Sequence, residues 1–457
     1  MPVTFRPLSR CSGPAVIAGL IGTLPTAALA APDWHVAPES PLGTAGAVML
    51  LVLMGLTVLL LAGHAVRHGR LTLARLFGAP RSPVADVVSA DWPPVTVLVM
   101  AHDDESVIED TLVRLMDADY PAERLTVVPV DDRSIDRTRA VIEAVARRFP
   151  GRLRPLHRTA GLPGRAAALQ DATRGIDTAF IVVIDAGCRP ARGLIRHLMA
   201  PFFDPEVGAV TGRVVPSPGG VTLLARLLDL GRAGDHQVGR QAGLHLGLVP
   251  AQGGMVSALR LAALHAVGGW RDEPLAADAD LACRLRLGGW TTIHADRAIS
   301  QAADATRWSA HAHETARQAR GRHQALSRHL ARTLTTPTLP WHARLDSALQ
   351  LGSHAMAPVL LAGWLLALLL YFTVAMDWIT PALIVMAFTL HGAPGHFAAF
   401  FEIAAAARLD RSHHRVRLLA FHWLGTLVDA VAITRGLLAP TGRGPDTPGG
   451  GHPGGRP

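Results

Sequence analysis

The stretch Val-Pro-Val-Asp-Asp-Arg-Ser-Ile-Asp-Arg-Thr, residues 128–138, joins a strand-forming run to a helix-forming run through two adjacent aspartates. The run at residues 125–130 is rich in β-branched side chains, and an amphipathic helix is predicted at residues 135–148. Asp131 and Asp132 therefore stand at the carboxyl end of a buried strand. Because open α/β sheets bind their ligands beyond that end, this stretch predicts both an α/β fold and a ligand site.

The same alternation of strands and helices extends outward over residues 94–332. Three further strands and two further helices are predicted, at residues 95–101, 152–157 and 179–184 and at residues 105–116 and 165–173. Strands that alternate with helices become parallel neighbours through right-handed crossovers. The predicted fold class is therefore α/β, with a mostly parallel sheet flanked by helices.

Acidic residues follow other predicted strands as well. The first strand ends at His102-Asp103-Asp104-Glu105, and the fourth ends at Asp185. Acidic clusters that meet at one sheet edge repel one another unless a cation or hydrogen-bond donors intervene, as a divalent metal with a nucleotide diphosphate would. The alternative is that each aspartate only caps the helix that follows it. The sequence has no glycine-rich phosphate loop of the usual types, which argues against kinases and dinucleotide-binding enzymes.

The positive charge of the chain comes entirely from arginine. The 457 residues include no lysine, and the formal net charge is +8. These arginines are scattered through predicted helices and juxtamembrane loops without interleaved aromatic residues, so they indicate a basic membrane flank and no nucleic-acid partner. The cysteines, Cys11, Cys188 and Cys283, lack metal-ligand spacing and are expected to be ordinary thiols.

Apolar stretches flank the α/β domain, which is predicted to span residues 93–332. Residues 42–66 contain no charged side chain and are long enough to cross a bilayer, which takes roughly 20 residues. Arg67 and Arg70 follow, and basic residues accumulate on the cytoplasmic side. The α/β domain is therefore expected in the cytoplasm of a multi-pass plasma-membrane protein. Residues 1–30 are either a signal peptide or a first membrane span.

Three more membrane segments are predicted after the α/β domain, at residues 347–376, 379–407 and 418–437. The second is broken by a Gly-Ala-Pro-Gly sequence between His391 and His396, so it is a kinked span, a re-entrant segment or an interfacial helix. The third carries Asp429, which is either a functional carboxylate in the membrane or one that snorkels or pairs with Arg435. The Pro/Gly-rich tail at residues 440–457 is expected to be disordered.

The order of these motifs resembles family 2 glycosyltransferases of the GT-A fold, in particular the membrane-bound branch that includes cellulose and hyaluronan synthases. The stretch at 128–138 resembles that family's VDDxSxDxT signature, and Gly-Arg-Ala-Ala-Ala-Leu-Gln at 164–170 resembles its G-K-x-x-A-L-N stretch. Residues 181–190 resemble the strand that carries the D-x-D motif, and residues 275–290 resemble the T-E-D region. The resemblance spans roughly residues 93–329.

The resemblance implies a role for each matching residue. Asp131 and Asp132 would hold the base and ribose of a nucleotide sugar, Asp185 would serve a diphosphate-bound Mg²⁺ or Mn²⁺, and Asp278 would be the general base. The implied donor site comprises His102, Asp104, Glu105, Asp131, Asp132, Arg165 and Asp185. His102 would pack on the base, or it is an ordinary turn histidine. The implied partners are a nucleotide-sugar donor, a glycan or lipid-linked acceptor, the lipid bilayer, and a synthase or export subunit.

Three motifs depart from the family pattern. The D-x-D motif keeps only its first aspartate, Asp185, and the T-E-D motif keeps only Asp278. In the preferred register, the Q-x-x-R-W motif reads Glu314-Thr-Ala-Arg317-Gln318. Arg317 would still pair with the donor diphosphate, but Gln318 replaces the tryptophan whose face would stack on an acceptor sugar.

These features leave three functional hypotheses. In the first, the protein is a membrane-bound inverting glycosyltransferase that acts in surface polysaccharide synthesis. In the second, the altered motifs mark a catalytically degenerate GT-A protein that binds a nucleotide or a synthase partner without turnover. In the third, the sugar is transferred to a lipid phosphate without chain growth, because the acceptor motif is the most altered of the three.

Overall fold

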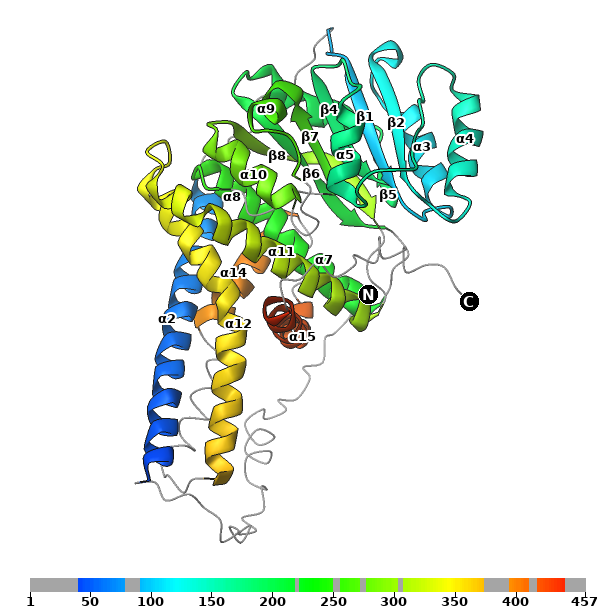
Figure 1. Cartoon of the computed structure of the whole chain (residues 1–457). Helices are drawn as coiled ribbons and strands as arrows, with labels where there is room; N and C mark the ends of the chain where they lie inside the picture. Colours follow the sequence, from blue (N-terminus) through cyan, green and yellow to red (C-terminus); the bar gives the residue numbers. More distant parts are fainter. Residues whose placement is uncertain are drawn as a thin grey trace, which may run out of the picture.

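The computed structural model describes residues 40–78, 91–217, 222–249, 255–271, 277–302, 307–373, 394–410 and 417–439. Figure 1 shows a sheet flanked by helices and, below it, two long helices that extend away from the sheet. The predictions for residues 1–30 and 440–457 lie outside the described residues. The sheet corresponds to the predicted α/β domain, and the long helices correspond to two of the predicted membrane segments.

One half of the sheet is parallel, in the order β3-β2-β1-β4. Its strands are β1 (Val95–Ala101), β2 (Leu125–Asp132), β3 (Leu156–Arg158) and β4 (Phe180–Asp185). The register aligns their carboxyl ends, with Ala101 opposite Asp131 and Met100 opposite Asp185. The predicted start of the third strand, at residue 152, is wrong. Pro155 has no amide hydrogen to donate, and it separates an isolated bridge at Leu153 from the strand itself.

Both faces of this half are covered by helices. All seven residues of β1 are buried, and alternate side chains enter two hydrophobic clusters. Val97 and Val99 face the first cluster, whereas Leu98 and Met100 face the second. The helices of the first cluster are α3 (Ile108–Met116), α4 (Thr138–Arg148) and α6 (Leu194–Met199), and those of the second are α5 (Arg165–Thr173), α9 (Leu261–Ala266) and α10 (Ala277–Leu287). A strand that is buried throughout and apolar at all but one position, Thr96, is typical of a parallel sheet covered on both sides.

The other half of the sheet is mixed, and among the described residues the strands form one eight-stranded sheet. β7 (Val256–Arg260) runs antiparallel to both β4 and β6 (Val207–Pro216), while β8 (Thr291–Ala302) runs parallel to β6 and antiparallel to β5 (Cys188–Pro190). Two 3₁₀ turns, η1 (Ala122–Arg124) and η2 (Ala200–Phe203), complete the domain. The prediction of a mostly parallel sheet therefore describes the first half well and the second half only in part.

Two helices of the described part are long and apolar enough to cross a membrane, α2 (Pro41–Phe77) and α12 (Trp341–Thr373). α2 contains the predicted segment at residues 42–66, and α12 overlaps the one predicted at 347–376. Ser40 caps α2, because its hydroxyl accepts a hydrogen bond from the Gly43 N–H at 3.1 Å. These helices run side by side away from the sheet (Figure 1).

Further helices lie between the sheet and the two long helices. They are α7 (Leu223–Gly234), the π-helix η3 (Asp235–Arg240), α8 (Gln241–His245), α11 (Trp308–Thr335), α14 (Pro394–Leu409) and α15 (Leu419–Leu438). Residues 374–393, which include the end of the predicted segment at 347–376 and the first part of the one at 379–407, lie outside the described residues. Figure 1 shows α15 almost end-on, whereas α2 and α12 are seen along their length. α15 corresponds to the predicted segment at 418–437, but it does not run alongside α2 and α12.

Polar contacts hold this layer together. Asp429 of α15 lies 2.7 Å from His311 of α11, so the structure pairs this carboxylate with a histidine and not with the suggested Arg435. Asp410, directly after α14, accepts hydrogen bonds from Arg213 of β6 at 2.8 Å and from Gln237 of η3 at 2.7 Å. The end of α14 is therefore fixed against the sheet domain.

Candidate functional site

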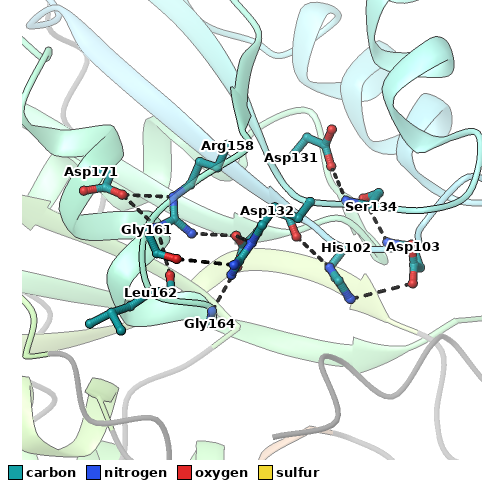
Figure 2. A network of polar contacts seen from close by, with 11 residues as sticks. His102, Asp103, Asp131, Asp132, Ser134, Arg158, Gly161, Leu162, Gly164 and Asp171 are labelled. Carbon is teal, nitrogen blue, oxygen red and sulfur yellow. Dashed lines mark hydrogen bonds and ion pairs between the residues drawn. The ribbon is translucent and has the colours of Figure 1, made fainter. Parts of the chain in front are cut away.

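The turns after β1 and β2 are tied to each other by reciprocal hydrogen bonds, and Figure 2 shows the one between Asp103 and Ser134. The Asp103 N–H donates to the Ser134 hydroxyl at 3.1 Å, and the Asp103 carboxylate accepts from the Ile135 N–H at 2.8 Å. Asp103 and Arg133 have positive φ angles of 55° and 62°, a left-handed conformation that non-glycine residues adopt only where neighbouring contacts hold it. These bonds fix both turns at the carboxyl edge of the sheet.

Asp104 and Glu105, two predicted donor ligands, take part in the same interlock. The Asp104 carboxylate accepts the His102 N–H at 3.0 Å, and the Glu105 carboxylate accepts the Arg137 N–H at 2.9 Å. Nearby, hydrogen bonds involving Thr138 and backbone amides outweigh the effect of burial and lower the pKa of Asp136. Neither side chain caps the helix that follows it, because the N-cap of α3 is Val107 and has no side-chain cap bond; the two carboxylates order the turns instead.

His102 lies between the two turns, with both ring nitrogens close to polar partners (Figure 2). Its Nδ1 is 2.7 Å from the Asp132 carbonyl oxygen, and its Nε2 is 3.6 Å from the Asp103 carboxylate. These contacts fit the turn role, one of the two roles that the sequence left open for His102.

Asp131 is buried at the end of β2 and held from two sides. One carboxylate oxygen accepts the Ser134 N–H at 3.1 Å, and the other lies 3.0 Å from His157 Nδ1. The second ring nitrogen of His157 is 2.8 Å from Glu143 on α4. His157 therefore fixes the orientation of Asp131, a role that the sequence did not reveal.

Asp132 connects β2 to the start of α5 through two contacts that Figure 2 shows. One oxygen lies 2.5 Å from Arg158 Nη1, and the other accepts the Gly164 N–H at 3.0 Å. Arg158 also pairs with Asp171 of α5 at 2.7 Å, and its side chain is only 4% exposed. Gly164 has a φ of 108°, which an L side chain rarely adopts. By holding the backbone at Gly164, Asp132 helps to position the next residue, Arg165.

Arg165 brings together two residues that lie far apart in the sequence. Its guanidinium forms an ion pair with Asp185 at the end of β4, and its Nε is 3.8 Å from the Asp278 carboxylate in the first turn of α10. The three side chains are between 29% and 36% exposed. The predicted metal ligand and the predicted base are therefore near neighbours at an accessible sheet edge.

Gln170 stands where the family pattern has asparagine. Its side-chain amide supports the backbone at Trp270. Its Oε1 accepts the Trp270 N–H at 3.1 Å. Gly269 has a φ of 70°, which L side chains rarely adopt, and a Cβ atom there would lie 2.5 Å from the same oxygen, so Gln170 would also have to shift. Trp270 itself is 4% exposed and belongs to the second hydrophobic cluster, which gives it a packing role.

Asp280, two residues after Asp278, joins α10 to α11. It is buried and pairs with Arg284 at 2.7 Å and with His329 of α11 at 2.7 Å. Burial opposes its ionisation, but the bonds from His329 and Arg284 outweigh that effect and lower its pKa to about 2. A signal for this contact exists in the sequence, because Asp280 and Arg284 are spaced for an i,i+4 pair on a helix.

The predicted acceptor residues cluster on α11. Arg317 and Gln318 both bond to Glu314, at 2.7 Å and 2.6 Å. Burial raises the pKa of Glu314, but the bonds from Arg317 and Gln318 outweigh this effect, and the net pKa is lowered. Gln318 also accepts a bond from Arg322 at 2.9 Å. The three predicted acceptor residues therefore contact one another, and the side chain of Gln318 is bonded to both Glu314 and Arg322.

Asp185 is the predicted metal ligand at this edge, and the second aspartate of the family's D-x-D motif is absent. Within the described ranges, no group of three His, Cys, Asp or Glu side chains is placed to hold a metal ion. Magnesium, however, is commonly bound by one or two carboxylates together with substrate phosphates. Asp185 therefore fits a divalent cation that arrives with a diphosphate, on condition that Arg165 gives up its ion pair.

Comparison with known proteins supports this description. Residues 93–321, about half of the chain, match the model of the glycosyltransferase-like family 2. The β-monoglucosyldiacylglycerol synthase of Synechocystis sp. is 30% identical over 213 residues, which are 46% of this chain and 44% of that protein. Glucomannan 4-β-mannosyltransferase 7 of Arabidopsis thaliana is 23% identical over 216 residues, 46% of this chain and 39% of that protein. The chain spans about half the length of the curated relatives it matches.

A solved structure shares the fold. The mannosyltransferase of Pyrobaculum calidifontis, in complex with GDP-Man and Mn²⁺, superposes with a TM-score of 0.59 at 20% identity, covering 79% of this chain and 99% of that chain. The likeness confirms the predicted GT-A fold. With the family model matched over half of its length, the chain belongs to the glycosyltransferase-like family 2.

Proposed function

We propose that the protein is a membrane-bound inverting glycosyltransferase that moves a sugar from a nucleotide-sugar donor to a lipid acceptor at the cytoplasmic face of the membrane. The observation that carries this proposal is the meeting of Asp185, Arg165 and Asp278 at the carboxyl edge of the sheet. Ligands of open α/β sheets bind at this edge, and the fixed turns after β1 and β2 border it.

In the proposed reaction, Asp278 takes the proton from an acceptor hydroxyl as its oxygen attacks the anomeric carbon. The new glycosidic bond forms on the face opposite the breaking bond to the diphosphate, so the anomeric centre inverts. A positioned base of this kind contributes on the order of 10²–10⁴-fold to the rate. Asp131 and Asp132 hold the nucleoside, and Arg165 contacts the leaving diphosphate. A divalent cation bound through Asp185 would neutralise charge on that leaving group.

Two observations support a lipid as the acceptor. The helices α2 and α12 are long and apolar enough to cross a membrane next to the sheet domain, and the Synechocystis relative is a β-monoglucosyldiacylglycerol synthase. In addition, Gln318 bonds to Glu314 at 2.6 Å and offers no aromatic face on which a polysaccharide would stack. Surface polysaccharide synthesis is therefore the less favoured form of the same activity.

The second candidate is a protein that binds a nucleotide without turnover. It is favoured by the pairing of key carboxylates within the chain itself, Asp132 with Arg158 and Asp185 with Arg165. In this hypothesis, those ion pairs replace the ligand contacts of an active enzyme.

Release of nucleotide diphosphate separates the two candidates. Membranes that carry the wild type, Asp278→Asn or Asp177→Asn are incubated with UDP-, GDP- and dTDP-sugars and with diacylglycerol, with and without Mn²⁺. We expect release by the wild type and by the Asp177 variant, whose exposed side chain lies outside the site. We also expect a loss of at least about 100-fold in the Asp278 variant, which should still bind the nucleotide. Nucleotide binding with no release from any donor would establish the non-catalytic candidate.

A further inference from the structure

Arg165 lies between the two carboxylates that the proposed reaction requires to be free. We infer that, in the donor-free protein, its guanidinium is an internal counter-cation that pins Asp185 and Asp278, and that the donor diphosphate releases both by drawing the guanidinium away. This inference rests on the proposed function for the roles of the two aspartates.

The three residues come from separate elements, so their meeting depends on the tertiary fold. Asp185 ends β4, Arg165 begins α5 and Asp278 lies in the first turn of α10. The backbone at the start of α5 is fixed, because the Gly164 N–H donates to Asp132 at 3.0 Å. Release of the two carboxylates therefore needs only a turn of the Arg165 side chain, with no movement of the helix.

The contacts of Arg165 leave it able to bind a diphosphate. Its Nη1 pairs with Asp185, but its Nε is buried without a hydrogen-bond partner and reaches Asp278 only at 3.8 Å. Guanidinium groups bind phosphate oxygens through two parallel N–H donors, which is stronger than one long ion pair. A diphosphate at the edge therefore offers Arg165 better partners than Asp278 does.

Arginine suits this bridging role better than the lysine of the family pattern. The planar guanidinium presents donors in two directions, whereas an ammonium group is a compact point charge. Arg165 can therefore contact Asp185 and Asp278 at the same time, from a side chain that is 29% exposed.

Competition between two cations for Asp185 is the main consequence. Without nucleotide, the Arg165 guanidinium paired with Asp185 would oppose the binding of a divalent ion at that carboxylate. With nucleotide, the diphosphate attracts the guanidinium and adds oxygen ligands for the ion. Asp278 then becomes free to accept a proton only after the donor is bound, which imposes an order on the proposed reaction.

Binding of Mn²⁺ in the absence of nucleotide tests this inference directly. The full chain in detergent is titrated with Mn²⁺, and free Mn²⁺ is measured by electron paramagnetic resonance. We expect Arg165→Gln to bind Mn²⁺ about tenfold more tightly than the wild type, a difference that corresponds to ~1.4 kcal/mol. The gain should disappear in the double variant Arg165→Gln/Asp185→Asn. Arg165→Lys should fall between the wild type and Arg165→Gln.

Arg174→Gln is the matched control, because it removes the same charge at the other end of α5. Arg174 is 72% exposed and pairs with Asp171, so its variant should bind Mn²⁺ as the wild type does. Equal Mn²⁺ affinity of the wild type and a folded Arg165→Gln would overturn the inference, even if sugar transfer is observed. If that variant does not fold, the comparison with Arg165→Lys decides in the same way. A tenfold gain without transfer from any donor would instead retain the ion-pair competition and reject the proposed reaction.

Discussion

Arg158 joins the parts of the site that face the proposed nucleoside. It bonds to Asp132 on β2, to Asp171 on α5 and to the Leu162 carbonyl in the loop between them (Figure 2). Because its side chain is 4% exposed, these acceptors replace nearly all of its contact with water. A buried cation of this kind is stable only while its partners are present, and the same holds for the carboxylates that it neutralises.

Substitution of Arg158 should therefore affect stability strongly. We expect Arg158→Gln to lower the free energy of unfolding by about 3 kcal/mol, since it leaves the buried Asp132 with only the partly exposed Arg133, at 3.2 Å, as its counter-cation. Urea unfolding of the detergent-purified protein measures the change. Arg174→Gln, which removes an exposed partner of the same Asp171, should stay within about 0.5 kcal/mol of the wild type. An Arg158 variant as stable as that control would show that Asp132 does not need the pairing.

At the scale of single residues, the sequence revealed the acidic residues but not their partners. Asp131, Asp132, Asp185 and Asp278 were found from their places after strands and from the family motifs. Arg158 is one of 44 arginines, and it reaches Asp132 across 26 positions in the chain. No local pattern indicates which arginine folds back onto which carboxylate, so such contacts were beyond prediction.

The joint between α10 and α11 shows how an element places the proposed base. Asp280 pairs with His329 at 2.7 Å, and this contact fixes the helix on which Asp278 stands against α11. The pKa of Asp280 is lowered from 3.8 to about 2, so the ionised form stabilises the folded state. This contribution is complete above pH 4 and is lost as the pH falls toward 2.

A pH series on Asp280→Asn tests the strength of this joint. We expect the wild type to be more stable than the variant at pH 7 and pH 5 by a constant amount. The difference should shrink below pH 4, by about 2 kcal/mol in total, because the lowered pKa of Asp280 corresponds to that energy. Urea midpoints measured from pH 7 to about pH 2 follow the change, with the exposed Asp177→Asn as control. A difference that does not vary with pH would mean that the carboxylate contributes by shape alone.

Helix and strand positions were predicted well in the first half of the domain, but their starts were not. The helices predicted from residues 105 and 135 begin at Ile108 and Thr138. The residues in between are compatible with a helix, yet the polar ones among them bond across to the neighbouring turn, as Glu105 does to Arg137 at 2.9 Å. Local periodicity carries no information about such cross-turn bonds, which hold the chain out of the helix.

Across the whole molecule, the sequence predicts the parallel half of the sheet but not the order and direction of the strands beyond β4. The parallel strands follow from local alternation, whereas the insertion of β7 antiparallel between β4 and β6 depends on pairing between distant segments. On the membrane side, the apolar runs indicated α2 and α12 directly. The layer between these helices and the sheet, with α11, α14 and α15, joins residues as far apart as Arg213 and Asp410. Composition gave no sign of that layer's geometry.

The position of α15 leads to a prediction about membrane topology. α15 contacts the first turns of α11 at two points, through Asp429 with His311 and where Gly436 approaches the Ala316 backbone. That part of α11 also carries Glu314 and Arg317, and charged side chains at the centre of a bilayer are unfavourable by several kcal/mol. α15 should therefore lie along the cytoplasmic surface, so both of its ends should be on the side of the sheet domain.

Reporter fusions that distinguish the two sides of the membrane test this arrangement. A reporter fused after Ala439 should be on the same side as the sheet domain, whereas one fused after Thr373, at the far end of α12, should be on the opposite side. Introducing Asp429→Leu should not move the first reporter, because the contact at Gly436 remains. A reporter after Ala439 on the opposite side would mean that α15 spans the membrane, as the apolar character of residues 418–437 alone suggests. The first turns of α11 would then have to enter the lipid together with α15. The ion pair between Glu314 and Arg317, at 2.7 Å, would partly neutralise the two charges there.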